Sequence, residues 1–139
     1  MHPINQVLLI DDDHISNFLT SSMIKRTGLT KNINICQDGQ EAMDWLQHCA
    51  KNAIPFPELI LLDINMPNMN GFDFLEAFRA LRTYSKRPVI TILTTSQNHQ
   101  DMEQLEKFPE VEVFLNKPLY EENLQYLVAK YFTKHSIAR

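Results

Sequence analysis

The chain contains five apolar runs rich in Val, Ile and Leu, which recur at fairly regular intervals along the sequence. The runs are Val7 to Ile10, Ile33 to Cys36, Leu59 to Leu62, Val89 to Leu93 and Val111 to Leu115. In the first, third and fourth runs the apolar residues are largely consecutive, which is typical of strands covered on both faces in a parallel sheet. Parallel strands need crossover connections, so we expect a helix in the interval after each run.

The intervals carry the signals of these helices. The first interval has apolar residues at helical spacing and a glycine placed to end the helix, namely Ile15, Phe18, Leu19, Met23 and Gly28. The other helices are expected after Asp38-Gly39, after Asn70-Gly71, between Asn98 and Phe108, and from Glu121 to Phe132. Alternating strands and helices with short connections predict an α/β fold, a doubly wound (βα)₅ sheet with right-handed crossovers.

The composition narrows the class of protein. The 139 residues suffice for one domain with a sizeable core, and 44% hydrophobic with 22% charged residues is typical of a globular chain. A net charge of −4 gives no positive field for binding a nucleic-acid backbone. The longest apolar runs are far shorter than the about 20 residues of a membrane span. Cys36 and Cys49 lack metal-ligand spacing and are expected to be reduced thiols. We therefore expect one cytoplasmic domain over residues 1–139, with a short tail at 133–139 and no binding to nucleic acid or membranes.

Polar residues follow four of the five predicted strands. They are Asp11-Asp12-Asp13, Asp63, Thr94-Thr95-Ser96 and Asn116-Lys117-Pro118. Because the carboxyl ends of parallel strands meet at one edge of the sheet, these groups should converge there. Several carboxylates brought together repel unless a cation neutralises them, and hard oxygen ligands suit Mg²⁺. A lysine and a hydroxyl opposite them could hold a phosphoryl group, so the pattern predicts a phosphoryl-transfer site.

Each element of this pattern also has a structural interpretation. Asp13 taken alone is expected to be the N-cap of the first helix, and Asp63 alone could be a turn residue. Lys-Pro is a common surface dipeptide, and the Thr-Thr-Ser run could cap the fourth helix. The simultaneous placement of all these groups at the ends of neighbouring strands favours the functional interpretation.

The motifs resemble the receiver (CheY-like) domains of bacterial two-component response regulators. The segment that begins at Asp63 is similar to the phosphoacceptor strand and its loop, with Pro67 four and Gly71 eight residues later. The other similar motifs are the acidic pair Asp11-Asp12, the start of the second helix at Asp38 to Ala42, the switch hydroxyl after Leu93, and Lys117-Pro118. The resemblance spans residues 6–132 and implies the flavodoxin-like strand order 2-1-3-4-5.

The resemblance implies a role for each site residue. Asp63 would be phosphorylated, and Lys117 and Thr94 would contact the phosphoryl group. Mg²⁺ would be held by Asp12, Asp63 and the backbone carbonyl of Asn65, with Asp11 contributing through water. Asn65 and Ser96 would tune slow self-dephosphorylation. A Lys-Pro bond is expected to be trans from sequence alone, whereas the resemblance implies a cis Lys117-Pro118 bond.

Three features depart from the family pattern. Thr95 could be the switch hydroxyl instead of Thr94, although Thr94 directly follows the apolar strand. Phe114 stands where the family often has Tyr, so it could turn inward but would lack a hydroxyl. The segment Phe108 to Glu112 replaces the usual small residues before the fifth strand, which leaves the fourth helix and its exit loop undefined.

Two other functions fit parts of the sequence. Asp11 and Asp13 match the DxD motif of haloacid-dehalogenase-like phosphatases, but that assignment leaves the Asp63 loop unexplained. A degenerate receiver would act only as a protein-binding module. We expect instead a stand-alone receiver that is not an enzyme beyond slow self-phosphorylation and self-dephosphorylation. Its partners would be a sensor histidine kinase or histidine phosphotransfer protein and a downstream protein or a second copy of the chain. The downstream partner would dock on the fourth helix, fifth strand and fifth helix, including Met102, Leu105, Tyr120 and Tyr131.

Overall fold

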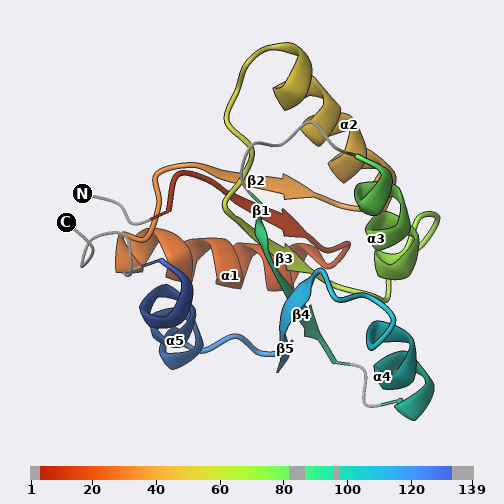
Figure 1. Cartoon of the computed structure of the whole chain (residues 1–139). Helices are drawn as coiled ribbons and strands as arrows, with labels where there is room; N and C mark the ends of the chain where they lie inside the picture. Colours follow the sequence, from red (N-terminus) through yellow and green to blue (C-terminus); the bar gives the residue numbers. More distant parts are fainter. Residues whose placement is uncertain (1–3, 82–86, 96–97, 133–139) are drawn as a thin grey trace.

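The computed structural model describes residues 4–81, 87–95 and 98–132, and these form one five-stranded parallel sheet with five helices (Figure 1). The strands are β1 (Val7–Ile10), β2 (Ile33–Cys36), β3 (Leu59–Leu62), β4 (Val89–Thr94) and β5 (Val111–Asn116). The helices are α1 (His14–Thr27), α2 (Gly39–Lys51), α3 (Gly71–Ala80), α4 (His99–Leu105) and α5 (Glu121–Tyr131). The strand order is β2-β1-β3-β4-β5, so the expected flavodoxin-like topology is confirmed. The predicted tail at 133–139 lies outside the described residues.

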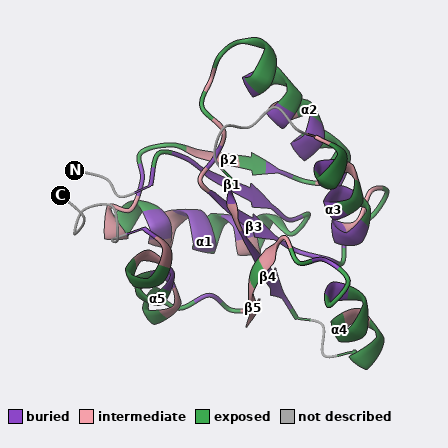
Figure 2. Cartoon of the chain, viewed as in Figure 1, coloured by how far each residue is buried: buried purple, intermediate pink, exposed green. Residues whose placement is uncertain are grey.

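Two apolar layers enclose the sheet. Alternate residues of β1, such as Leu8 and Leu9, enter different layers because successive side chains of a strand point to opposite faces. The larger layer lies under α2, α3 and α4 and includes Phe74 and Phe78, whereas α1 and α5 close the other face. Figure 2 shows the buried strands between these helices. Burial on both faces explains why β1 and β3 consist entirely of apolar residues.

The first helix forms where predicted, but with a different buried face. Gly28, at φ 73°, ends α1 in the left-handed conformation, as expected. The apolar residues Ile15, Phe18 and Leu19 are nevertheless 73%, 69% and 59% exposed. The residues that α1 buries are Asn17, Thr20, Ser21 and Ile24. Apolar spacing therefore located the helix correctly, whereas packing against the sheet selected a mostly polar face.

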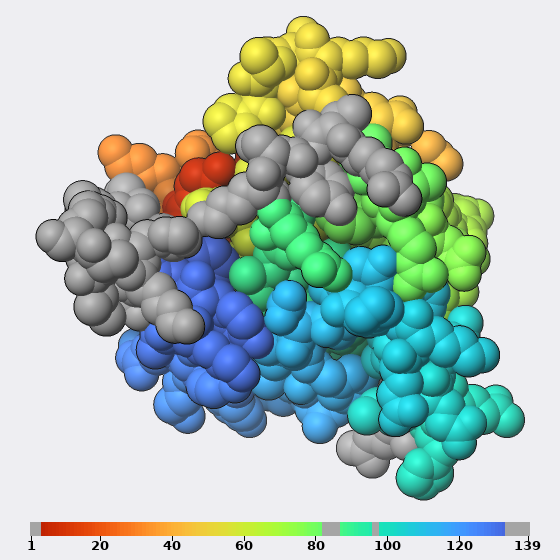
Figure 3. Space-filling view, in the orientation of Figure 1, coloured from red at the N-terminus to blue at the C-terminus, as the bar shows by residue number. Residues whose placement is uncertain are grey.

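The segment between α4 and β5 has a defined shape. α4 ends at Leu105, before the predicted limit at Phe108, and Glu112 is skipped between the pairs Ile90–Val111 and Thr91–Val113. This extra residue is a β-bulge in β5. Arg79 of α3 fixes the exit loop through hydrogen bonds of 2.7 and 3.0 Å to Glu110 and of 3.0 Å to the Lys107 carbonyl. In the space-filling view, α4, β5 and α5 follow one another along one side of the molecule (Figure 3).

Candidate functional site

Three carboxylates meet at the carboxyl ends of the central strands. Asp11 and Asp12 directly follow β1, Asp63 directly follows β3, and these two strands are neighbours. One carboxylate oxygen from each residue lies within 4.8 Å of the others. Asp11 and Asp63 are buried, whereas Asp12 is exposed. The structure thus brings together the acidic residues that the sequence analysis selected.

Lys117 joins this cluster from the end of β5. Its ammonium donates to Asp11 Oδ2 in a very short contact and lies 3.4 Å from Asp63 Oδ2. The Lys117-Pro118 peptide bond is cis, as the resemblance implied and contrary to the expectation from sequence alone. Lys117 therefore bridges the two buried carboxylates and contacts the side chain expected to be phosphorylated.

Burial and neighbouring charges set the ionisation of the site. Burial raises the pKa of Asp63 above its usual value, and the negative charge of Asp11 adds to this. The Asn65 amide, the Lys117 charge and a hydrogen bond with Thr94 lower the pKa of Asp63 but do not cancel the increase. For Lys117, burial lowers the pKa, but the Asp11 hydrogen bond and the charges of Asp63 and Asp11 outweigh it and raise the pKa. The lysine therefore remains charged at neutral pH.

The loop after β3 holds the Asp63 carboxylate in place. Its Oδ1 accepts a hydrogen bond of 3.1 Å from the Asn65 backbone amide. Ile64 and Met66 point their apolar side chains into the core, whereas Asn65 is exposed. Asn68 adopts a positive φ of 61°, a conformation that Asn tolerates better than most residues, and lets the loop turn back toward α3.

The structure distinguishes the two candidate switch threonines. Thr94 is the last residue of β4, is completely buried and forms a side-chain hydrogen bond with Asp63. Thr95, the next residue, is exposed. The geometry therefore favours Thr94 over Thr95. Ser96, the other expected contributor from this segment, lies outside the described residues.

The remaining predicted residues lie around this centre. Asp13 is the N-cap of α1 and accepts from the amides of Ile15 and Ser16 at 3.0 and 3.3 Å. This engagement leaves Asp13 poorly suited to the general-acid role of the phosphatase alternative. Phe114 on β5 is half-buried against the layer under α2, α3 and α4.

Asn17 belongs to the support of the site and was not predicted. Its side-chain amide donates a hydrogen bond of 2.8 Å to the backbone carbonyl of Asp11, and the residue is only 4% exposed. This contact ties α1 to the chain at the acidic cluster. The available signal was an Asn one turn after the N-cap Asp13, but its burial follows only from the face that α1 turns to the sheet.

The charge balance of the cluster fits a bound cation. Three carboxylates face a single lysine among the described residues, which leaves an excess of negative charge. Carboxylate oxygens are the ligands that Mg²⁺ prefers, and the exposure of Asp12 leaves room for metal-bound water. The donor set therefore suits a hydrated divalent cation better than a fully enclosed metal site.

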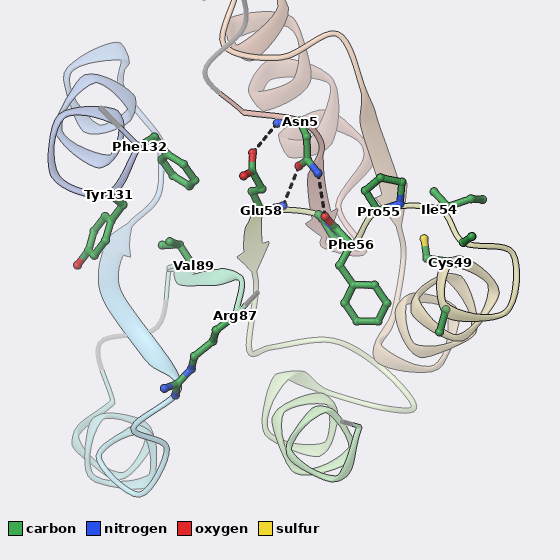
Figure 4. A pocket seen from close by; sticks show the side chains of 13 residues that line it. Asn5, Cys49, Ile54, Pro55, Phe56, Glu58, Arg87, Val89, Tyr131 and Phe132 are labelled. Atoms are coloured by element: carbon green, nitrogen blue, oxygen red, sulfur yellow. Dashed lines mark hydrogen bonds between the residues drawn. The ribbon is translucent and has the colours of Figure 1, made fainter. Parts of the chain in front are cut away.

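A cavity of about 490 Å³ lies at the opposite end of the sheet. Its lining includes Asn5, Glu58 and Val89, which stand at the amino-terminal ends of the strands (Figure 4). Asn5 and Glu58 hydrogen-bond to each other there, at 2.7 and 3.1 Å. This cavity contributes no group to the acidic cluster. Among the described residues, no helix has the length and apolarity needed to cross a membrane.

The fold and the site together define a signalling module with an aspartate at the end of its central strand. The chain matches the response regulator receiver domain over residues 7–129, and it belongs to this family. Receiver domains are generally signalling modules of two-component systems rather than enzymes, and they bind Mg²⁺ at an acidic cluster.

Individual relatives agree with this assignment. Response regulator Rcp1 of Synechocystis is 31% identical over 73% of this chain and 69% of its own length. The probable methanogenesis regulatory protein FilR2 of Methanothrix harundinacea is 29% identical over 86% of this chain and 76% of its own length.

Solved structures show the same fold. A two-component response regulator from Cytophaga hutchinsonii superposes with a TM-score of 0.81 and 31% identity, covering 91% of this chain and 96% of that one. The Mn²⁺-bound form of Rcp1 superposes with a TM-score of 0.72 and 28% identity, covering 92% and 94% of the two chains.

Proposed function

We propose that this receiver accepts a phosphoryl group on Asp63 from a phosphohistidine of a sensor kinase or phosphotransfer protein and passes the signal to a separate protein. The observation that carries the proposal is the surroundings of the Asp63 carboxylate. Lys117 contacts one of its oxygens, the Asn65 amide donates to the other, and Thr94 hydrogen-bonds to the same side chain.

Phosphoryl transfer follows from this arrangement. An Asp63 carboxylate oxygen attacks phosphorus, the new O–P bond forms, and the N–P bond of phosphohistidine breaks with its electron pair remaining on the imidazole, which is protonated by solvent. Lys117 stabilises the negative charge on the phosphoryl oxygens, and the Thr94 hydroxyl donates to one of them. Because Lys117 and the Asn65 amide contact Asp63 before the donor arrives, only the Thr94 hydroxyl has to shift toward the phosphoryl group.

The acidic cluster would hold Mg²⁺ through Asp12, Asp63 and the Asn65 backbone carbonyl, with Asp11 acting through water. When bound, the ion supplies positive charge that offsets the charge on the transferring phosphoryl group. The Mn²⁺-bound form of Rcp1 supports a divalent cation in this fold. The slow self-dephosphorylation expected from the resemblance belongs to the same proposal, and the cytoplasmic location stays a prediction.

The donor has an available docking surface on α1. Ile15, Phe18 and Leu19, here called the α1 patch, are strongly exposed and follow the acidic cluster directly in the chain. An exposed group of large apolar side chains is typical of a protein-interaction surface. A donor that covers the α1 patch would be close to Asp63, so this patch supports a protein as the source of the phosphoryl group.

The proposal is tested by phosphorylation with acetyl phosphate and Mg²⁺ and by intact-protein mass spectrometry. The wild-type protein should gain one phosphoryl group, Asp63→Asn should gain none, and Asp12→Ala should require more Mg²⁺. Glu103→Ala, which removes one exposed carboxylate from α4, is the matched charge control and should behave as the wild type. Labelling that survives in Asp63→Asn but disappears in Asp11→Asn would support the phosphatase function instead.

A further inference from the structure

Helix α2 begins directly against the loop that carries Asp63. Gly39 is the first residue of α2, after the N-cap Asp38, and the first amides of a helix have no acceptor within it. The Gly39 amide donates instead to the backbone carbonyl of Met69, at 2.9 Å. One unsatisfied group of α2 thus becomes an anchor for the loop between β3 and α3.

The close contact depends on the missing side chain of Gly39. A Cβ atom at this position would lie 2.9 Å from the Met69 carbonyl oxygen and 2.8 Å from its Cγ. The Cγ belongs to a flexible side chain, but the carbonyl is backbone and cannot move without moving the loop. Any residue larger than glycine would therefore push the loop away from α2.

The remainder of the loop transmits such a displacement to the site. Two residues after Met69, Gly71 packs so closely against the start of the loop that a Cβ there would lie 2.6 Å from Ile64 Cα. Between these two contacts, Met66 is buried in the core, so the loop has little free space. Asn65, which donates to Asp63, lies inside this restrained segment.

We infer that Gly39 is a positioning residue for the phosphoryl site and acts through Met69 on the loop that holds Asp63 and Asn65. The inference rests on the proposed function, because the quantity that Gly39 controls is the placement of the Mg²⁺ and phosphoryl ligands. Helix α2 supplies no residue to the phosphoryl site, but through Gly39 it would affect the chemistry of that site.

The test compares Gly39→Ala with Gly28→Ala in the full chain. Gly28 has a φ of 73°, and no atom lies within 4 Å of a Cβ placed there. Ala at position 28 therefore strains α1 at its far end, about 20 Å along the helix from Asp13, and controls for a loss of stability alone. The readouts are Mg²⁺ titration followed by ¹H–¹⁵N spectra of Asp12, Asp63 and Asn65, the rate of labelling by acetyl phosphate, and thermal unfolding.

We expect Gly39→Ala to bind Mg²⁺ on the order of tenfold more weakly than wild type. Its rate of labelling by acetyl phosphate should fall by on the order of tenfold as well, since a misplacement of reacting groups by about 1 Å can lower a reaction rate by up to about 100-fold. Gly28→Ala should lower the unfolding temperature while Mg²⁺ affinity and labelling rate stay unchanged.

Three outcomes would count against these statements in different ways. Equal Mg²⁺ affinity and labelling rate in Gly39→Ala and wild type would overturn the positioning role. A similar loss in Gly28→Ala would overturn it too, because the effect would then be one of stability. Absence of Mg²⁺ binding and labelling in the wild type would instead refute the proposed function.

Discussion

At the scale of single residues, the site is dominated by an imbalance of charge. Asp11 and Asp63 are buried, and Lys117 is the cation that contacts both of them among the described residues. Removing the partner of a buried charge leaves that charge uncompensated, which is strongly destabilising. Lys117 is therefore expected to support the fold as well as to contact the phosphoryl group.

Lys117→Met, which keeps an unbranched side chain one atom shorter and removes the charge, should lower the free energy of unfolding at neutral pH. We expect a loss of about 2–3 kcal/mol, below the about 3–5 kcal/mol seen when fully buried pairs are broken. Because folding raises the pKa of Lys117, its contribution is fully present below the unfolded-state pKa and is lost as the pH rises through the higher folded-state value.

Urea unfolding across a pH series measures this dependence. The difference between wild type and Lys117→Met should persist from neutral into moderately alkaline pH and disappear only at strongly alkaline pH. It should also shrink toward acidic pH, where Asp63, whose pKa is raised by burial, takes up a proton. A difference that is constant across the whole series would show that Lys117 contributes packing rather than charge.

At the scale of elements, α1 contacts the backbone of the site with its buried face and presents an apolar surface with its exposed face. Its buried face carries Asn17, which ties the helix to the Asp11 carbonyl, and its exposed face carries the α1 patch next to the acidic cluster. The helix thus connects the site to the surface that we propose as the docking site of the phosphoryl donor.

Phe18→Asp should slow phosphoryl transfer from a phosphorylated histidine kinase by about tenfold or more, because hot-spot aromatic residues contribute about 2 kcal/mol or more to interfaces. Labelling by acetyl phosphate should not change, since Phe18 is 69% exposed and the small donor needs no docking surface. Measuring both rates separates docking from chemistry. Met102→Asp is the matched control, with an apolar side chain 40% exposed on α4, and it should leave both rates unchanged. Equal loss in both assays for Phe18→Asp would place its effect on the site itself.

At the scale of the whole molecule, the site and the expected output surface lie on connected elements. Thr94 ends β4 and pairs with Asn116 of β5. On the expected surface, Tyr120 is 57% exposed and Tyr131, the last residue of α5, is half-buried. Met102 of the expected surface is exposed, but Leu105 is buried at 7% exposure and can contribute only if α4 moves. Phe114 is half-buried on β5 and pairs with Ile92 of β4, two residues before Thr94.

Phosphorylation should change this surface. The phosphoryl group adds a charge of about −1.5 to −2, which should draw Thr94 toward it, and Phe114 would then turn inward into the space that Thr94 leaves. Full burial of a Phe contributes about 1.5–3 kcal/mol, enough to shift two states separated by a few kcal/mol. ¹H–¹⁵N spectra with beryllofluoride and Mg²⁺ should show shifts across residues 99–120, and Asp63→Asn should show none. Shifts confined to the loops around Asp12 and Asp63 would contradict this switch.

Much of the fold and the centre of the site could be predicted because they depend on local patterns. Strands buried on both faces are continuously apolar, so the sequence by itself determined where the strands lie. The residues that follow parallel strands meet at one edge of the sheet, so the sequence also determined that Asp11, Asp63 and Lys117 converge. Positive-φ and capping residues such as Gly28 and Asp13 also act locally, and both were predicted correctly.

Only the tertiary structure decided which surfaces meet. Packing against the sheet, where Asn17 contacts the Asp11 carbonyl, selected the face that α1 buries, so Phe18 was predicted at a helix but its exposure was not. The bulge at Glu112 depends on the pairing of β5 with β4. The contact between Gly39 and Met69 joins segments about thirty residues apart, and no local pattern specifies it. Local chemistry determines the elements, whereas long-range packing selects among the faces and registers that those elements allow.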